Sequence, residues 1–239
     1  HLQIVKRDAQ TGASVPLAGF TFQLLDSNHK PVSQTCWYPA YNVMDTFTTD
    51  ATGTVTLPES LMPGTYYVRE TSAKEPYLVG GEIEVNIPAD INLTPVAIVS
   101  YYNHAATGNI RIVKTDAVDG SSLAGATFEI RASGDIVRPD GSIAALDGET
   151  VATVTTDETG EARADDLPLG SGTARYEVVE TQAPTGFLLD RTHHIVDLTY
   201  ADQKTPVVEA RLNVSDDYTK VDISKVDASG EQEVKGAQL

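Results

Sequence analysis

The stretch YYNHAATGNIRIVKTD, from Tyr101 to Asp116, holds the end of one strand pattern, a short joint containing Gly108, and the start of another strand pattern. Asn103 closes the first pattern and Lys114 lies in the second. Alternate residues of a strand share a face, and both of these polar residues fall in phase with apolar neighbours. Because lysine is almost never fully buried without a partner, this placement is the first indication of function.

Composition excludes several classes of protein. The 239 residues are 41% hydrophobic, enough for packed cores, and carry a net charge of −17. Such an acidic chain has no surface to neutralise phosphates, so we expect no nucleic-acid partner. No apolar run approaches the ~20 residues of a membrane span.

Cys36 is the single cysteine and cannot form an internal disulfide; we interpret it as a small, half-buried residue beside Trp37. With no start Met, signal peptide or anchoring tail, we expect a piece of a longer chain.

The chain repeats itself. Lys6 and Lys114 are 108 residues apart, and Glu70 and Glu180 are 110 apart. Four segments recur in the same order, which is the signature of tandem units: IVKRD (4–8) as IVKTD (112–116), PLAGFTFQL (16–24) as SLAGATFEI (122–130), TTDATGTV (48–55) as TTDETGEA (155–162), and YYVRETSAKEPYL (66–78) as YEVVETQAPTGFL (176–188). ISKVD (223–227) opens the pattern once more. We therefore predict units at 1–106 and 107–217, followed by a linker and the first strand of a truncated third repeat at 218–239.

Each unit is predicted to be all-β. Its segments are short, rich in Val, Ile, Thr and Tyr, and separated by clusters of Gly, Pro, Asp and Asn. No segment has an apolar period of 3.6. The pattern favours tandem antiparallel Ig-like β-sandwiches of about a hundred residues each. Longer insertions at 26–47 and 131–154 are expected to be hairpins or loops on the outside.

Alternation places further polar residues on the apolar faces. Asn213 shares its face with charged residues and is expected to face solvent, so Asp216 is the better candidate for the buried polar residue at the end of the second unit. Each unit is thus predicted to bury one Lys from its first strand, one Glu from an internal strand and one Asn or Asp from its last strand: Lys6, Glu70 and Asn103, then Lys114, Glu180 and Asp216.

The order I-x-K-x-D, L-x-G-A-x-F, Y-x-V-x-E-T-x-A-P-x-G-F/Y and a closing Asn resembles the Cna B-type (SpaA-like) repeats of Gram-positive surface adhesins and pilins. The resemblance covers nearly all of both units, and VVETQAPTGF (178–187) is its most specific part. The first unit departs from it at Lys74 and Pro76, which replace the proline and the glycine of the box. The second departs at Asp216, where Asn is commoner, although the family includes Lys–Asp versions.

The resemblance implies spontaneous intramolecular isopeptide bonds, Lys6 to Asn103 and Lys114 to Asp216, with Glu70 and Glu180 as catalytic residues. Burial disfavours both the charged amine and the charged carboxyl, which leaves a nucleophilic NH2 beside an acid. Holding amine and carbonyl together contributes roughly 7–11 kcal/mol. The alternative is a buried hydrogen-bonded cluster without a covalent bond, which often gives little net stability.

Three functions follow as hypotheses. The first is an extracellular stalk or shaft module, without enzymatic turnover or cofactor, in a protein that sortase anchors to the cell wall outside this piece and that meets a host or neighbouring-cell ligand. The second is a ligand-binding adhesin module using Trp37, Tyr38 and Tyr41, and the third is an accessory domain of a large secreted enzyme.

His193 and His194 are adjacent and point to opposite faces, so we expect no metal site. Lys225 is expected to be unbonded, in a tail that is mobile or held only by packing.

Overall fold

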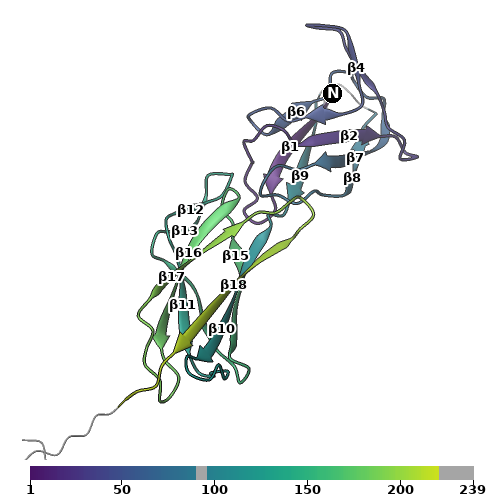
Figure 1. Ribbon diagram of the computed structural model, residues 1–239. Coiled ribbons are helices and arrows are strands. Elements are labelled where there is room, and N and C mark those ends of the chain that lie inside the picture. Colours follow the sequence, from purple (N-terminus) through teal and green to yellow (C-terminus); the bar gives the residue numbers. More distant parts are fainter. Residues whose placement is uncertain (90–95, 221–239) are drawn as a thin grey trace, which may run out of the picture.

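The computed structural model describes residues 1–89 and 96–220, and the regular structure of these residues is β-strand throughout. Figure 1 shows two elongated units placed end to end, the first formed by β1–β9 and the second by β10–β18. The predicted all-β class is confirmed. No helix long and apolar enough to cross a membrane occurs in the described part of the chain.

The first unit packs two sheets against each other. One has the order β6 (Thr54–Thr56), β1 (Leu2–Asp8), β9 (Ala97–Asn103). The other has the order β5 (Phe47–Thr48), β2 (Thr21–Leu25), β7 (Gly64–Ser72), β8 (Glu82–Ile87). A separate hairpin of β3 (Gln34–Cys36) and β4 (Asn42–Met44) projects from this sandwich, within the predicted insertion.

The second unit repeats this plan. Its three-stranded sheet has the order β15 (Glu161–Pro168), β10 (Thr107–Asp116), β18 (Val207–Asp216). The four-stranded sheet has the order β14 (Thr150–Thr155), β11 (Thr127–Ala132), β16 (Thr173–Gln182), β17 (His193–Thr199). The hairpin of β12 (Ile136–Val137) and β13 (Ile143–Ala145) lies in the second insertion.

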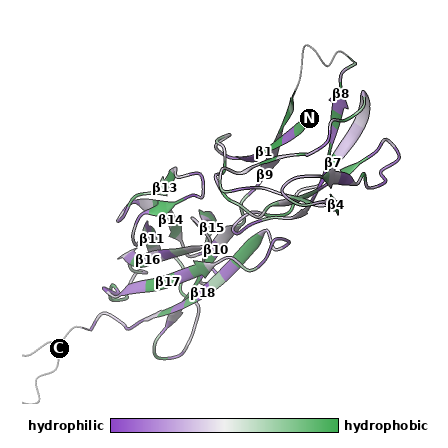
Figure 2. Ribbon diagram, turned by 90° about the horizontal axis from the view of Figure 1, so that it is seen from above, coloured by the Kyte–Doolittle hydropathy of each residue, from purple (hydrophilic) through white to green (hydrophobic). Residues whose placement is uncertain are grey.

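Burial follows the alternation of the sequence. Along β1 every second residue is buried, and β10 keeps the same pattern from Ile110 onward. Figure 2 shows hydrophobic and hydrophilic residues interleaved along strands such as β18. Two separate apolar clusters result, one around Phe22 and Val68 and one around Phe128 and Val178. The sandwich therefore buries whatever side chain occupies an inward position, including a polar one.

The first and last strands of each unit run parallel to each other, unlike the antiparallel pairing expected for the sandwich. In β1 and β9 the register sets Asp8 opposite Asn103, and in β10 and β18 it sets Asp116 opposite Asp216. A parallel pair needs a long connection, and here the rest of the unit supplies it. Because side chains two residues apart share a face, Lys6 and Asn103 are diagonal neighbours on the core side, as are Lys114 and Asp216.

Two glycine turns lie directly against the strands that carry the lysines. Gly53 and Gly160 have φ of +75° and +76°, which L side chains rarely adopt. A Cβ on Gly53 would lie 1.8 Å from the Val15 carbonyl oxygen, and one on Gly160 would lie 2.6 Å from the Lys114 carbonyl oxygen. The carbonyl groups of these glycines accept hydrogen bonds from the N–H groups of Lys6 (2.9 Å) and Lys114 (2.8 Å).

The joint between the units is short and hydrogen-bonded. The Val79 N–H donates to the Gln203 carbonyl at 2.9 Å, and the Ala73 N–H donates to Gln203 Oε1 at 2.8 Å. Leu78 of the first unit packs against the apolar cluster of the second, and Ala106 belongs to that cluster. The joint therefore shares part of its packing with the second core.

Candidate functional site

The first candidate site draws one residue from each of three strands. Lys6 lies on β1, Glu70 on β7 and Asn103 on β9, so the two packed sheets both contribute. All three residues are at least 97% buried. The inward positions that alternation predicts for them place the three side chains in the same core.

Glu70 touches both of its predicted partners. Lys6 Nζ donates to Glu70 Oε1 at 3.0 Å, and Asn103 Nδ2 donates to Glu70 Oε2 at 2.6 Å. The Gly80 N–H also donates to Oε2 at 2.6 Å, and Asn103 Nδ2 donates to the Leu78 carbonyl at 2.7 Å. One carboxyl group therefore connects an amine and the NH2 of a side-chain amide, while Asn103 Oδ1 is buried without a hydrogen-bond partner.

The surroundings weaken the charged form of the Lys6 amine. Burial lowers the pKa of Lys6 to about 8, and the nearby Glu70 carboxylate opposes part of that shift. The amine also lies over aromatic rings, 4.8 Å from the centroid of Phe20 and 4.5 Å from that of Tyr101. The charged form of the amine retains some stabilisation from these rings.

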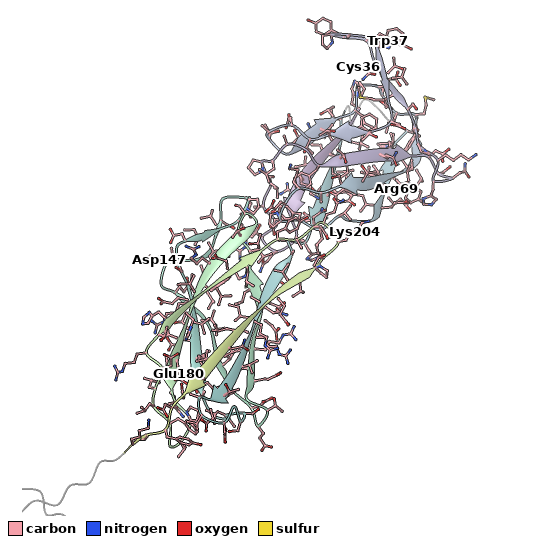
Figure 3. The ribbon with its side chains drawn as sticks, in the orientation of Figure 1. Cys36, Trp37, Arg69, Asp147, Glu180 and Lys204 are labelled. Carbon is pink, nitrogen blue, oxygen red and sulfur yellow. The ribbon has the colours of Figure 1, made fainter. Side chains whose placement is uncertain are left out.

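The second candidate site has the same plan with an acid in place of the amide. Lys114 on β10 donates a short hydrogen bond to Asp216 on β18, and its Nζ lies 3.0 Å from Oε1 of Glu180 on β16. The Asp190 N–H donates to Glu180 Oε2 at 2.7 Å. Glu180 lies near the end of the second unit that is farther from the first (Figure 3).

Two carboxyl groups share one amine at this second site, and one of them is disposed to hold a proton. Burial raises the pKa of Glu180, more than the hydrogen bonds from Asp190 and Lys114 lower it. Asp216 Oδ2 is buried without a hydrogen-bond partner. Asn213, the alternative partner, is exposed and accepts a hydrogen bond from Arg211, so it lies away from Lys114.

Sequence reasoning missed several groups in and beside the first site. Asp8 is buried and its Oδ2 accepts a hydrogen bond from the Tyr77 hydroxyl at 2.8 Å. Asp8 has the same parity as Lys6 and recurs as Asp116, and that signal was present in the repeated I-x-K-x-D segment. The Leu78 carbonyl and the Gly80 N–H could not be found from side-chain patterns, because they are backbone groups of a loop.

The predicted binding residues form an exposed cluster at the tip of the β3–β4 hairpin. Trp37 is 74% exposed, Tyr38 86% and Tyr41 66%, and the rings of Trp37 and Tyr41 meet edge to face at 5.2 Å. Figure 3 shows Trp37 at the far end of the projecting hairpin. The half-buried Cys36 donates from Sγ to the Tyr38 carbonyl at 3.0 Å.

The remaining predictions concern metals and the tail. No group of three or more His, Cys, Asp or Glu residues able to hold a metal occurs in residues 1–89 and 96–220. His193 pairs with Glu177 and His194 pairs with Asp190, each at 2.8 Å. Lys225, predicted to be unbonded in a tail that is mobile or held only by packing, lies outside the described residues.

Comparison with known families gives one clear match. The model of the SpaA prealbumin-like fold domain matches the chain twice, at residues 1–100 and 108–212. The two matches correspond to the two sandwiches and confirm the resemblance found in the sequence. No curated protein sequence matches the chain.

The chain is similar to several solved structures, and the TIE protein shares its fold. The TIE protein of Bacillus anthracis is similar at 21% identity and a TM-score of 0.54, over 91% of this chain and 33% of that one. A streptococcal ancillary pilin is 20% identical over 91% of this chain and 62% of its own length, with a TM-score of 0.35. The shaft pilin SpaA of Lactobacillus rhamnosus GG is 18% identical over 92% of this chain and 97% of its own, also with a TM-score of 0.35. This chain thus spans a third of the TIE protein.

Proposed function

The chain belongs to the SpaA family of prealbumin-like fold domains, and we propose that it is a stalk module of a Gram-positive surface adhesin or pilin whose two units lock themselves with isopeptide bonds. The observation that carries the proposal is the position of Glu70. Its two carboxyl oxygens contact the Lys6 amine and the Asn103 amide nitrogen at 3.0 and 2.6 Å.

In the first unit the proposed reaction joins Lys6 to Asn103. A proton moves from the Lys6 ammonium to Glu70, and the neutral amine attacks Cγ of Asn103. The new C–N bond forms, the bond from Cγ to Nδ2 breaks, and Glu70 gives its proton to the departing nitrogen, which leaves as ammonia. The Glu70 carboxylate then takes the second proton of the attacking nitrogen, which becomes the N–H of the new amide. General acid–base catalysis of this kind and the enforced proximity of the buried groups both lower the barrier of the reaction.

The second unit runs the same reaction with an acid. Lys114 attacks Cγ of Asp216, a C–N bond forms, a C–O bond breaks, and water leaves. Glu180, whose pKa burial raises, is the group that holds the proton for the departing hydroxyl.

The consequence of each bond is mechanical. It ties the first strand of a unit to the last, β1 to β9 and β10 to β18, across a closed loop of nearly the whole unit. By analogy with a disulfide that closes a ~100-residue loop, the chain-entropy gain is about 4.7 kcal/mol. Force applied at the two ends of a unit loads these adjacent strands, and a covalent link carries that force past the rest of the sandwich.

The setting we propose is the outside of the cell. The units are assigned to 1–106 and 107–217, in a protein that sortase anchors to the cell wall through a segment outside this sequence. Its partners are then neighbouring subunits or host-surface ligands met by the full-length protein. A stalk held by amide bonds is insensitive to reduction, which suits a chain whose single cysteine is Cys36.

Intact mass tests the proposal. The folded chain is expected to be lighter than its sequence by one ammonia plus one water, and peptide mapping should locate Lys6 joined to Asn103 and Lys114 joined to Asp216. Glu70→Ala should abolish the loss of ammonia and leave the loss of water. A folded wild-type chain of unchanged mass would refute both bonds.

The exposed aromatic hairpin supports a second candidate, a ligand-binding adhesin module. Trp and Tyr at the tip of a projecting hairpin offer rigid, amphipathic contact area of the kind that dominates binding interfaces. Binding of the chain to host proteins or glycans, lost in Trp37→Ala while the masses of both cross-links persist, would support this function. Equal binding by Trp37→Ala and wild type would exclude the hairpin as the contact.

A further inference from the structure

Both clusters hold their glutamate with the same backbone contact. The N–H group ten residues after the glutamate donates to its Oε2, from Gly80 to Glu70 at 2.6 Å and from Asp190 to Glu180 at 2.7 Å. This N–H fixes one oxygen of the carboxyl group, and so determines which way the other oxygen faces. The loop that carries the N–H must itself be held in place, and the two units hold it differently.

In the first unit a tyrosine holds the loop. Tyr101 is the register partner of Lys6, and its hydroxyl donates a short hydrogen bond to the Gly81 carbonyl. The contact demands glycine at position 80, because a Cβ there would lie 2.6 Å from the Tyr101 hydroxyl oxygen. Tyr101 and Gly80 are therefore a coupled pair.

In the second unit both members of this pair are replaced. Val214 is the register partner of Lys114 and has no hydroxyl, and Asp190 occupies the position of Gly80. The Asp190 side chain holds the loop instead, because its Oδ1 accepts from the Thr192 N–H and its Oδ2 pairs with His194 Nε2, each at 2.8 Å. His194 lies on β17, opposite Val178 of the strand that carries Glu180.

The pair formed by His194 and Asp190 lies beside the reacting groups. A surface hollow of about 350 Å³ is lined by Asp190, His194 and Asp216 together with neighbouring residues of β18. The side chains of His194 and Asp190 are 22% and 18% exposed. A side-chain contact with this much burial is better fixed than the exposed pairs whose contribution is near zero.

We propose that His194 is a positioning residue for the second isopeptide bond. Through the Asp190 side chain it holds the loop whose N–H orients Glu180, and so aims the carboxyl group at Lys114 and Asp216. His194 exchanges no proton with the reacting atoms; the C–N bond still forms between Lys114 and Asp216, with loss of water. The inference rests on the proposed function, because it needs that bond to form.

The test compares rates of cross-linking in one chain. Chain isolated in denaturant before it has folded is diluted into refolding buffer, samples are quenched in acid, and peptide mapping follows both bonds over time. His194→Ala should slow the second bond by roughly 10- to 100-fold, the effect of a small misplacement of reacting groups. The first bond, formed in the same molecules, should keep its rate and serves as the internal control.

Two further variants separate positioning from a general loss of structure. His194→Gln keeps a side-chain N–H donor and should restore the rate to within about threefold of wild type. Asp190→Gly should slow the second bond, and adding Val214→Tyr to it should recover the rate by rebuilding the device of the first unit. Val214→Tyr alone should slow the bond, because the ring meets the side chain at 190.

The outcomes are distinct. A wild-type rate in His194→Ala, or no recovery in both His194→Gln and Asp190→Gly/Val214→Tyr, would overturn the positioning role. If wild type itself forms the first bond and never the second, the proposed Lys114–Asp216 reaction has failed, and the inference fails with it for that separate reason. Equal thermal unfolding of Lys114→Ala and Lys114→Ala/His194→Ala would show that His194 acts on the reaction rather than on the fold.

Discussion

The two oxygens of Glu70 make its cluster more than a buried ion pair. A lone Lys6–Glu70 pair would gain little, because desolvation of two charges offsets their attraction. The contact from Asn103 to the second oxygen adds an amide whose nitrogen can leave with the proton that the lysine gave up. At the scale of single residues, the proposed function therefore depends on Asn103, the third member of the cluster.

The pH dependence of the first bond follows from this proton count. In the resting ion pair the Lys6 amine holds the proton that it shares with Glu70, and in the reactive pair Glu70 holds it. Both forms contain the same number of protons, so pH does not change their ratio while the shared proton stays bound to one of the two groups. Burial lowers the pKa of Lys6 to about 8, where the shared proton is lost. We therefore predict a rate of bond formation that is flat below pH 8 and falls about tenfold per unit above it.

Refolding from denaturant into buffers between pH 6 and pH 10, with acid quench and peptide mapping, measures this rate. A rate that rises through pH 8 would mean that simple deprotonation of Lys6 to solvent activates the amine. In that case Glu70 does not supply the acid.

Removal of the amide should expose the stability that the bond contributes. In Asn103→Ala the proposed covalent link between β1 and β9 cannot form, and we expect the unfolding free energy of the first unit to fall by about 5 kcal/mol. For a domain of this size that lowers Tm by roughly 20 °C or more. Calorimetry should resolve an early transition for the first unit, while Asp216→Ala, the matched control, should lower the transition of the second unit instead.

At the scale of elements, the glycine turns fix the strands that carry the lysines. Gly160→Ala places a Cβ 2.6 Å from the Lys114 carbonyl oxygen at a φ of +76°, so the turn must move away from β10. We predict a loss of about 2 kcal/mol or more in the second unit and a slower second bond, because Lys114 loses its fixed neighbour. Gly148→Ala is the control, since its φ is also +76° but no atom lies within 4 Å of the added Cβ.

Chemical denaturation of the two variants in a Lys114→Ala background separates fold from bond. Equal losses in Gly160→Ala and Gly148→Ala would mean that the positive φ alone matters. The contact with β10 would then have no role.

The elements also show what the sequence could predict. A period of two is enough to place Lys6, Glu70 and Asn103 inward, because inward positions alternate whichever neighbour a strand pairs with. For the same reason alternation cannot tell a parallel from an antiparallel pair, and the parallel β1–β9 contact was not foreseen. The exchange of Tyr101 and Gly80 for Val214 and Asp190 was equally hidden, because the pairing of Tyr101 with Gly80 is a steric contact between residues 21 positions apart.

At the scale of the whole molecule, the cluster of Lys6, Glu70 and Asn103 lies next to the joint. The Leu78 carbonyl accepts from Asn103, while the Leu78 side chain packs against the second core and the following N–H, from Val79, donates to Gln203. Tyr200 of the second unit adds a hydrogen bond from its hydroxyl to the Tyr77 carbonyl at 3.2 Å. One loop of the first unit thus contacts both Asn103 of its own unit and the second unit.

This arrangement predicts that the two units move as one rigid body. Side chains of the second unit are expected to maintain the relative orientation of the units. Gln203→Ala/Tyr200→Phe removes two hydrogen bonds across the joint, each contributing about 1 kcal/mol, and leaves both cores untouched. We expect a broader distribution of distances between spin labels placed on β6 and β14, with both cross-links and both thermal transitions unchanged. Lys204→Ala, in the same turn but with an exposed side chain, is the control. An unaltered distance distribution in the double variant would assign the rigidity to the packing of Leu78 and to the three-residue passage from β9 to β10, rather than to the hydrogen bonds of the turn.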